Sequence, residues 1–195
     1  SEFLRRASLD LTGKIPSVHD SREYLKDTSP DKQRELVGRL LKRATYATHF
    51  ANVWRELMLP GANNNLQTRA MTPQFEDWLR MRLVTGVPFD QTVDEVVTFQ
   101  PPTDENQQQV VRRQANQPTP NAFLVLHENK PENLASAVAS VFLGVQVQCA
   151  QCHRHPFADW SQEQFWSFAA FFAPDAQTKG IQIEGKGDTV NAVFL

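Results

Sequence analysis

The chain has 195 residues, of which 41% are hydrophobic and 22% charged, and it carries a formal net charge of -2. These values are typical of a globular chain that buries a core as one domain or two small ones. A near-neutral charge without a long basic run argues against a general nucleic-acid binder. Since no run of about 18 apolar residues occurs, no segment is expected to enter a membrane.

The first sixty residues are predicted to form successive helices. Apolar residues at helical spacing predict a helix from residue 3 that stops at Gly13, and Ser17 is placed to cap a short second helix. Ser29-Pro30-Asp31 predicts another helix start, with Pro30 at the first helical position. An amphipathic pattern over residues 46–58 predicts the next helix, closed by Pro60-Gly61.

The middle of the chain alternates polar and apolar segments. Residues 62–69 are predicted to be a loop, and Thr72-Pro73 to start a helix that Gly86 ends. A short helix is expected over residues 89–97. Residues 100–120 contain four prolines and six glutamines. This composition predicts a long surface excursion and a boundary between two halves of the chain.

The last third is predicted to be helical and to end in a β-hairpin. An apolar helix is expected over residues 133–144, and Ser161 is placed to cap an aromatic-rich helix. Residues 181–184 and 189–193 alternate in polarity around Gly185, which predicts a β-hairpin. The expected fold is therefore mainly α: a multi-helix domain over residues 1–174, followed by a small C-terminal β-hairpin or extended tail over residues 175–195.

One short motif indicates chemistry. Cys149-Ala150-Gln151-Cys152-His153 contains the only two cysteines of the chain. Two thiols at this spacing can add to the two vinyl groups of a haem, and the next side chain then lies under the iron as its axial imidazole. The motif predicts covalent attachment of haem c, with His153 as the proximal iron ligand.

Three other interpretations of the motif stay open. A thioredoxin-like redox pair would follow a strand, whereas the preceding segment is predicted to be helical. A zinc site needs four ligands, and the motif with His155 offers them only within seven residues. A disulfide between the two cysteines would close a very short loop and constrain little of the unfolded chain.

Longer stretches of the sequence resemble a known family. They are residues 3–16, the helix start at residues 29–32 and residues 142–157, which include Cys149-Ala150-Gln151-Cys152-His153-Arg154-His155-Pro156-Phe157. Together they resemble the planctomycete cytochrome-associated domain family, from the first residues to about Pro174. Domains of this family have no known function and occur in large exported proteins.

The resemblance implies a haem-bearing or haem-like domain without defining a reaction. It implies that Cys149 and Cys152 are the attachment positions, that His153 is the axial ligand and that His155 is a further polar residue of the site. Position 154 departs from the family pattern, where Asp or Asn is more common. Arg154 places a positive charge there instead.

The sixth iron ligand decides what such a haem can do. A second strong ligand favours electron transfer, whereas an open position admits a small molecule. His155 is too close to His153 to reach the opposite face of the same ring. The remaining candidates include His127, His49, Met58 and Met81. The methionines also have the spacing of ordinary core residues.

Aromatic and basic side chains surround the motif in the sequence. Phe157, Trp160 and the aromatic residues between 165 and 172 are candidates for the wall of a haem pocket, or for an ordinary helix core. Arg112, Arg113 and Arg154 are candidates to pair with haem propionates. The alternative is that these arginines lie on the surface as solvated charges.

We therefore expect a c-type cytochrome-like domain that transfers electrons to a redox partner, rather than an enzyme. It is expected to belong to a larger protein exported to the periplasm or beyond, since haem c is normally attached outside the cytoplasm. One alternative is a haem enzyme or ligand sensor with an open sixth position. Another is a structural or interaction domain whose motif binds a different metal or forms a disulfide.

Overall fold

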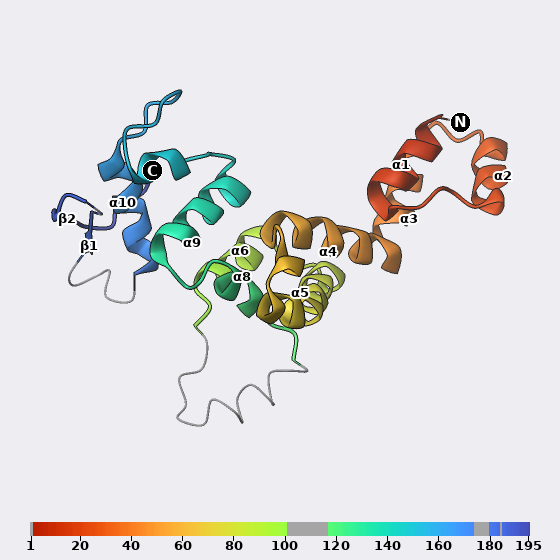
Figure 1. Cartoon of the computed structure of the whole chain (residues 1–195). Helices are drawn as coiled ribbons and strands as arrows, with labels where there is room; N and C mark the ends of the chain where they lie inside the picture. The colour runs from red at the N-terminus through yellow and green to blue at the C-terminus, as the bar shows by residue number, and fades with distance from the viewer. Residues whose placement is uncertain (1, 101–116, 174–179, 184) are drawn as a thin grey trace.

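The structure is a computed structural model that describes residues 2–100, 117–173, 180–183 and 185–195. Helices dominate it, and two antiparallel strands lie near the C-terminus (Figure 1). This confirms the predicted mainly α class with a small C-terminal hairpin. The elements are α1 (Glu2–Thr12), α2 (Val18–Lys26), α3 (Lys32–Leu41), α4 (Ala44–Met58), η1 (Ala62–Asn64), α5 (Leu66–Thr85), α6 (Phe89–Val97), α8 (Asn121–Leu126), α9 (Pro131–Val138), η2 (Ala139–Leu143), η3 (Gln148–Gln151), α10 (Gln162–Ala169), η4 (Ala170–Phe172), β1 (Ile181–Gln182) and β2 (Thr189–Val190).

The first three helices gather at one end of the molecule (Figure 1). α1 ends at Gly13, which adopts a left-handed φ of 66°. Ser17 caps α2 as predicted, because its hydroxyl accepts a hydrogen bond from the Asp20 amide at 3.0 Å. α3 begins at Lys32 rather than at Pro30, since Pro30 lies in the turn that precedes the helix.

The prediction of a loop over residues 62–69 is wrong. Asn65 caps α5, and its side-chain oxygen accepts hydrogen bonds from the Gln67 amide at 2.9 Å and the Thr68 amide at 3.1 Å. Helix α5 therefore begins at Leu66, and Pro73 lies inside it instead of at its start. Proline lacks an amide hydrogen and costs one helix bond, but the cap and the buried face of α5 hold the helix through this point.

Helix α8 was not predicted. It has only six residues, and three of them, Ala122, Phe123 and Leu124, are buried. Glu128 and Asn129 then turn the chain with φ values of 57° and 50°, and α9 follows. The apolar helix predicted over residues 133–144 is present as α9 and the π-helical turn η2, and it ends at Gly144 with a φ of 68°.

The C-terminal helix and hairpin pack together. Ser161 caps α10 with a capping box, as predicted. Strand β1 pairs with β2 in antiparallel register, with Ile181 opposite Val190. The paired strands are shorter than the alternating pattern in the sequence. Ile183 is 4% exposed and joins the same buried cluster as Phe165 of α10, so the hairpin packs against the helices.

Several predictions fall on parts of the chain that the structure does not describe. The expected surface excursion and sub-boundary in residues 100–120 lie almost entirely in 101–116, together with Arg112 and Arg113. The expected boundary at residues 174/175 falls in 174–179. These predictions lie outside the described residues.

Two clusters of buried hydrophobic side chains occur among the residues that the structure describes. The N-terminal cluster consists of Leu4, Tyr24, Leu36 and Leu40 and joins α1, α2 and α3. The main cluster extends from Ala51 and Met58 of α4 to Phe165 and Phe168 of α10, and Phe75, Phe123 and Ala135 within it are fully buried. Burial of apolar surface is the main source of stability in both clusters.

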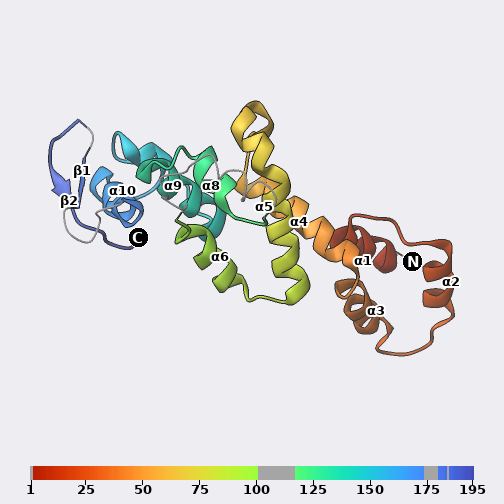
Figure 2. The same ribbon diagram turned by 90° about the horizontal axis from the view of Figure 1, so that it is seen from below.

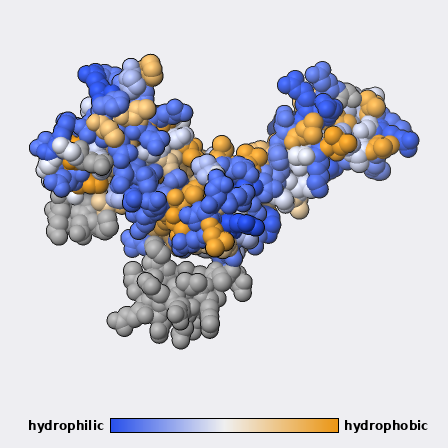
Figure 3. Space-filling view, in the orientation of Figure 1, coloured by the Kyte–Doolittle hydropathy of each residue, from blue (hydrophilic) through white to orange (hydrophobic). Residues whose placement is uncertain are grey.

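Helix α4 connects the two parts of the molecule. Figure 2 shows it running from α1 and α3 to the central helix α5, while α9, α10 and the hairpin lie at the far end. The space-filling view shows apolar residues on the surface over the middle of the molecule and over the N-terminal helices (Figure 3). Among the described residues, no helix has both the length and the apolar character to cross a membrane.

Candidate functional site

The Cys-x-x-Cys-His segment follows α9 and is fixed to the core by two small apolar side chains. After Gly144 the chain enters the short 3-10 helix η3. Val147 and Ala150 are 1% and 0% exposed and belong to the main cluster. Side chains three residues apart lie on the same side of a 3-10 helix, so this pair turns one side of η3 toward the core.

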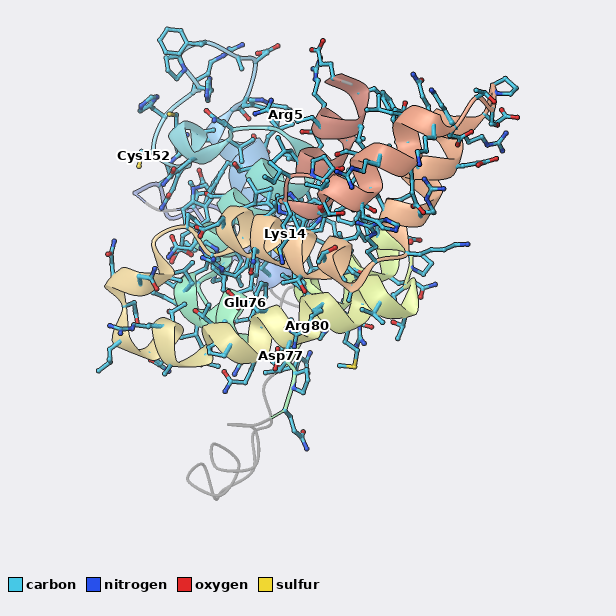
Figure 4. All side chains as sticks on the ribbon, turned by 90° about the vertical axis from the view of Figure 1, so that its right-hand side faces the viewer. Arg5, Lys14, Glu76, Asp77, Arg80 and Cys152 are labelled. Atoms are coloured by element: carbon cyan, nitrogen blue, oxygen red, sulfur yellow. The ribbon has the colours of Figure 1, made fainter. Side chains whose placement is uncertain are left out.

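The two cysteines lie on the solvent side of the same turn. Cys149 and Cys152 are also three residues apart, and both are exposed free thiols. Figure 4 shows Cys152 at the edge of the molecule. Burial of Val147 and Ala150 therefore leaves the two cysteines on the exposed side of the turn.

A carbonyl group between the cysteines is held by α10. The Gln151 carbonyl oxygen accepts a hydrogen bond from Gln162 Nε2 at 3.1 Å and another from Trp166 Nε1 at 3.0 Å. Both donors are buried, being 7% and 5% exposed. Two hydrogen bonds from a packed helix fix the backbone of η3 in one position.

His153 is exposed, and one nitrogen of its ring is engaged. Nδ1 lies 2.7 Å from the Arg154 carbonyl oxygen. In the tautomer that carries the proton on Nδ1, this nitrogen donates to the carbonyl and Nε2 is left with its lone pair. Histidines that bind metals commonly have their second nitrogen held by a carbonyl or carboxylate in this way.

The segment after His153 forms a loop that is closed at its base. The His155 amide donates to the Trp160 carbonyl at 2.9 Å, and Arg154 forms an ion pair with Asp159. Within the loop the Phe157 amide donates to His155 Nδ1 at 3.2 Å, so the His155 ring helps to fix the loop. The side chain of Phe157 is 94% exposed at its tip.

The aromatic residues that follow this loop belong to the core. Phe165, Trp166 and Phe168 are 1%, 5% and 3% exposed and lie in the main cluster. Phe171 is half-exposed. The aromatic helix therefore supports η3 from behind. Trp160 is partly buried and packs against the main cluster, whereas Phe157 is exposed to solvent.

The two methionines proposed as sixth ligands have other environments. Met58 is fully buried in the main cluster at the end of α4. Met81 lies on α5 and is 40% exposed. Neither helix adjoins the motif in the chain, and both lie in the middle of the molecule, whereas α10 and the motif lie at its end (Figure 1).

The two histidines proposed as sixth ligands also contact other helices. The His49 ring on α4 packs edge-on against Phe50 and lies against Gly13. His127 follows α8, and its ring packs edge-on against Phe123 with centroids 4.7 Å apart. Burial lowers the pKa of His127, and a hydrogen bond with the backbone of Met58 opposes this effect.

The described residues offer little for a bare metal ion. Among them, no group of three or more His, Cys, Asp or Glu side chains is arranged to hold one. Nothing in the sequence signalled the Gln151 carbonyl, because it acquires its role only through contact with α10.

The chain matches a known family over residues 1–177, described as "Protein of unknown function (DUF1549)" and abbreviated PSCyt2. The chain belongs to this family. The DUF1549 match includes the helices from α1 to α10 and the whole Cys-x-x-Cys-His segment, and it ends before β1. No curated protein and no solved structure matches the DUF1549 chain.

Proposed function

We propose that this DUF1549 domain carries one haem c, attached through Cys149 and Cys152 with His153 as the proximal iron ligand, and that it transfers electrons within a longer exported protein. The observation that carries the proposal is the pair of exposed free thiols on one side of η3, followed directly by an exposed imidazole. A c-type attachment site requires this donor set.

The surrounding residues suit this role. Val147, Ala150 and the hydrogen-bonded Gln151 carbonyl hold η3, so the two sulfur atoms have a fixed backbone beneath them. The Arg154 carbonyl orients the His153 ring and leaves Nε2 for the metal. A bound haem would supply one-electron chemistry. The exposed site would keep its edge close to a redox partner protein or domain.

The fit of the donor set also bears on where the protein acts. Thioether attachment normally takes place outside the cytoplasm, so we propose a periplasmic or otherwise exported location for the parent protein. The planctomycete origin implied by the sequence resemblance agrees with this location and belongs to the same proposal.

A second candidate is a haem with an open sixth position that binds a small molecule. The positions of three predicted ligands favour it, because Met58 is buried in the main cluster, His49 lies against Gly13 and His127 packs against Phe123. An iron with one open position would act as a ligand sensor or reactive centre instead of a simple electron carrier.

The test is to express the chain with an export signal in bacteria that also produce a haem c maturation system. We expect the intact mass to rise by one haem and the reduced protein to show the absorption bands of haem c. The variant with Cys149→Ser and Cys152→Ser should lose both signals. Cys152→Ser alone should keep at most one thioether bond. The variant His49→Ala is the matched control and should retain the haem.

The same material separates the alternatives. A reduced spectrum that shifts on addition of carbon monoxide indicates an open sixth position, and an unchanged spectrum indicates two strong ligands. Bare thiols, or a mass lower by two hydrogens as in a disulfide, would overturn the haem proposal. The domain would then be a structural or interaction module.

A further inference from the structure

Helix α6 presents an acidic side to solvent. Asp90 and Asp94 are exposed and four residues apart, so they lie on the same side of the helix. Glu95 of α6 is paired with Arg82 at 2.7 Å, whereas neither aspartate forms an ion pair with a described residue. Like charges at this spacing repel each other, so a basic partner would stabilise this side of α6.

Exposed apolar side chains adjoin the start of α6. Phe89 is 50% exposed, and its ring centroid lies 4.9 Å from that of Trp54 and 6.4 Å from that of Phe142. Leu57 follows Trp54 by one helical turn and is 53% exposed, and Leu143 follows Phe142 and is 42% exposed. Apolar groups that gather on a surface commonly mark a contact with another protein.

Helix α2 has the complementary character. Arg22 and Lys26 are exposed, lie four residues apart and form no ion pair with any residue in the described part of the chain. Val18 and Leu25 are 68% and 64% exposed and lie on the same side of α2 as Arg22. Tyr24 is buried in the N-terminal cluster. The outward side of α2 therefore combines two bases with two apolar side chains.

The charge along the chain follows the same division. Residues 1–43, which precede α4, contain ten basic and seven acidic residues and have a formal charge of +3. Residues 44–195 contain ten basic and fifteen acidic residues and have a formal charge of -5. The part of the chain that contains α2 therefore attracts the part that contains α6 when two molecules meet.

One molecule does not bring its own α2 and α6 together. Figures 1 and 2 both show α2 at the N-terminal end and α6 in the middle of the molecule. Helix α4 connects these parts and has 15 residues. A helix of that length is about 22 Å long. The two surfaces are therefore available only to other molecules, and a second copy of this chain offers both of them.

We propose that two copies of this chain associate through α2 of one copy and α6 of the other. Arg22 and Lys26 would pair with Asp90 and Asp94, because a spacing of four residues advances about 6 Å along either helix. Val18 and Leu25 would cover the apolar surface around Phe89. Two such contacts between the same molecules close a dimer, and single contacts continue as a chain. The association does not depend on a haem.

Sedimentation velocity of the full 195-residue chain tests the association. The protein concentration is varied from about 1 μM to about 1 mM, at about 0.05 M and about 0.5 M sodium chloride. A reducing agent prevents disulfide bonds between molecules through the exposed Cys149 and Cys152. We expect the sedimentation coefficient to rise with protein concentration, and the high salt concentration to weaken association by screening the ion pairs.

Charge reversal tests the two surfaces. Asp90→Lys with Asp94→Lys should weaken association at least about tenfold, and Arg22→Glu with Lys26→Glu should do the same. A mixture of these two double variants should associate, because each α2 then meets an α6 of opposite charge. The variant with all four charges reversed should also associate by itself.

A matched control separates this contact from an effect of net charge. Asp10→Lys with Glu163→Lys changes the charge as much as the double variant of α6, at exposed positions on α1 and α10. It should leave association within about twofold of the wild type. Circular dichroism checks that every variant keeps its helices.

Three results would overturn the proposal. One is a wild-type chain that remains a monomer over the whole concentration range, which would mean that α6 serves a different molecule. Another is equal weakening by the control and by the α6 variant. The third is a folded variant with all four charges reversed that stays monomeric. The wild-type measurement decides the proposal even if a variant fails to fold.

Discussion

Gly13 ends α1 in a conformation that other residues adopt only at a cost. Its φ is 66°, and a Cβ atom at this position would lie 2.6 Å from Nδ1 of His49. The glycine therefore permits both the left-handed turn and the close approach of α4 to the end of α1.

Replacing this glycine should destabilise the N-terminal helices. Gly13→Ala combines left-handed strain with a steric clash, and we expect it to cost about 1–3 kcal/mol. Hydrogen exchange of α1 and α3 measures the loss. The double variant Gly13→Ala with His49→Ala should cost less than the sum of the two single variants, because it removes the clash. Strict additivity would contradict this explanation.

His127 should make the stability of the protein depend on pH. Burial lowers its pKa below the ordinary value of 6.5, and its Nε2 is buried without a hydrogen-bond partner in the described structure. The unfolded chain therefore takes up the proton more readily than the folded chain. The His127 contribution is fully present above pH 6.5 and is lost as the pH falls below that value.

Urea denaturation at a series of pH values tests this assignment. The free energy of unfolding of the wild-type chain should fall between pH 7.5 and about pH 5, and His127→Gln should reduce that fall. His19→Gln is the control, because His19 is exposed on α2 and interacts with Glu23. Equal pH dependence in wild type and His127→Gln would show that other groups are responsible.

At the scale of elements, one carboxylate joins α5 to α6. Glu95 Oε2 accepts from Trp78 Nε1 at 3.1 Å and from Arg82 Nε at 2.7 Å. Trp78 is 2% exposed, so its indole N–H depends on this acceptor. The carboxylate therefore fixes the angle at which α6 packs beside α5.

Removal of this carboxylate should cost more than an ordinary surface substitution. Glu95→Ala leaves the Trp78 N–H without its acceptor, and we expect a loss of about 1–3 kcal/mol in urea denaturation. Asp94→Ala on the same helix is the control, because Asp94 is exposed and should change stability by less than about 0.5 kcal/mol. Similar losses in both variants would indicate that only helix propensity changed.

The elements also show what the sequence could and could not predict. Ser17 and Ser161 were identified as caps because a capping box is local and needs only neighbouring residues. Pro73 was misplaced because proline usually begins a helix, whereas here the Asn65 cap starts α5 earlier. Helix α8 is short and owes its stability to burial of Phe123, which no local pattern shows.

The candidate site also has features that the sequence could predict and features that it could not. The residues of the motif could be identified from their types and spacing alone. Exposure of both thiols follows from burial of Val147 and Ala150 on the other side of η3, which depends on the core. The Gln151 carbonyl is held by side chains of α10, so its role could not be located from the sequence.

At the scale of the whole molecule, the two buried clusters should differ in stability. The N-terminal cluster consists of four buried side chains, whereas the main cluster includes many more from α4 to the hairpin. Less apolar burial gives less stability. We expect the amides of α1, α2 and α3 to exchange with deuterium faster than those of α5, α9 and α10.

Substitutions in the core test whether the two clusters unfold separately. Leu40 is 1% exposed, and Leu40→Ala should cost about 2–5 kcal/mol within the N-terminal cluster. Exchange should accelerate in α1 to α3 and stay unchanged in α9 and α10. Phe165→Ala in the main cluster should instead accelerate exchange in α9 and α10 and leave exchange in α1 to α3 unchanged. Uniform acceleration in both variants would show that the chain unfolds as one unit.

Helix α4 also determines how the two clusters are rotated relative to each other about its axis, because it has buried residues at both of its ends. Ala47 near its start is buried, and Met58 at its end is buried in the main cluster. Each residue of an α-helix turns the chain by about 100° and advances it by about 1.5 Å. Inserting two residues into α4 would turn one cluster nearly to the opposite side of the other, whereas an insertion of seven would nearly preserve their mutual orientation.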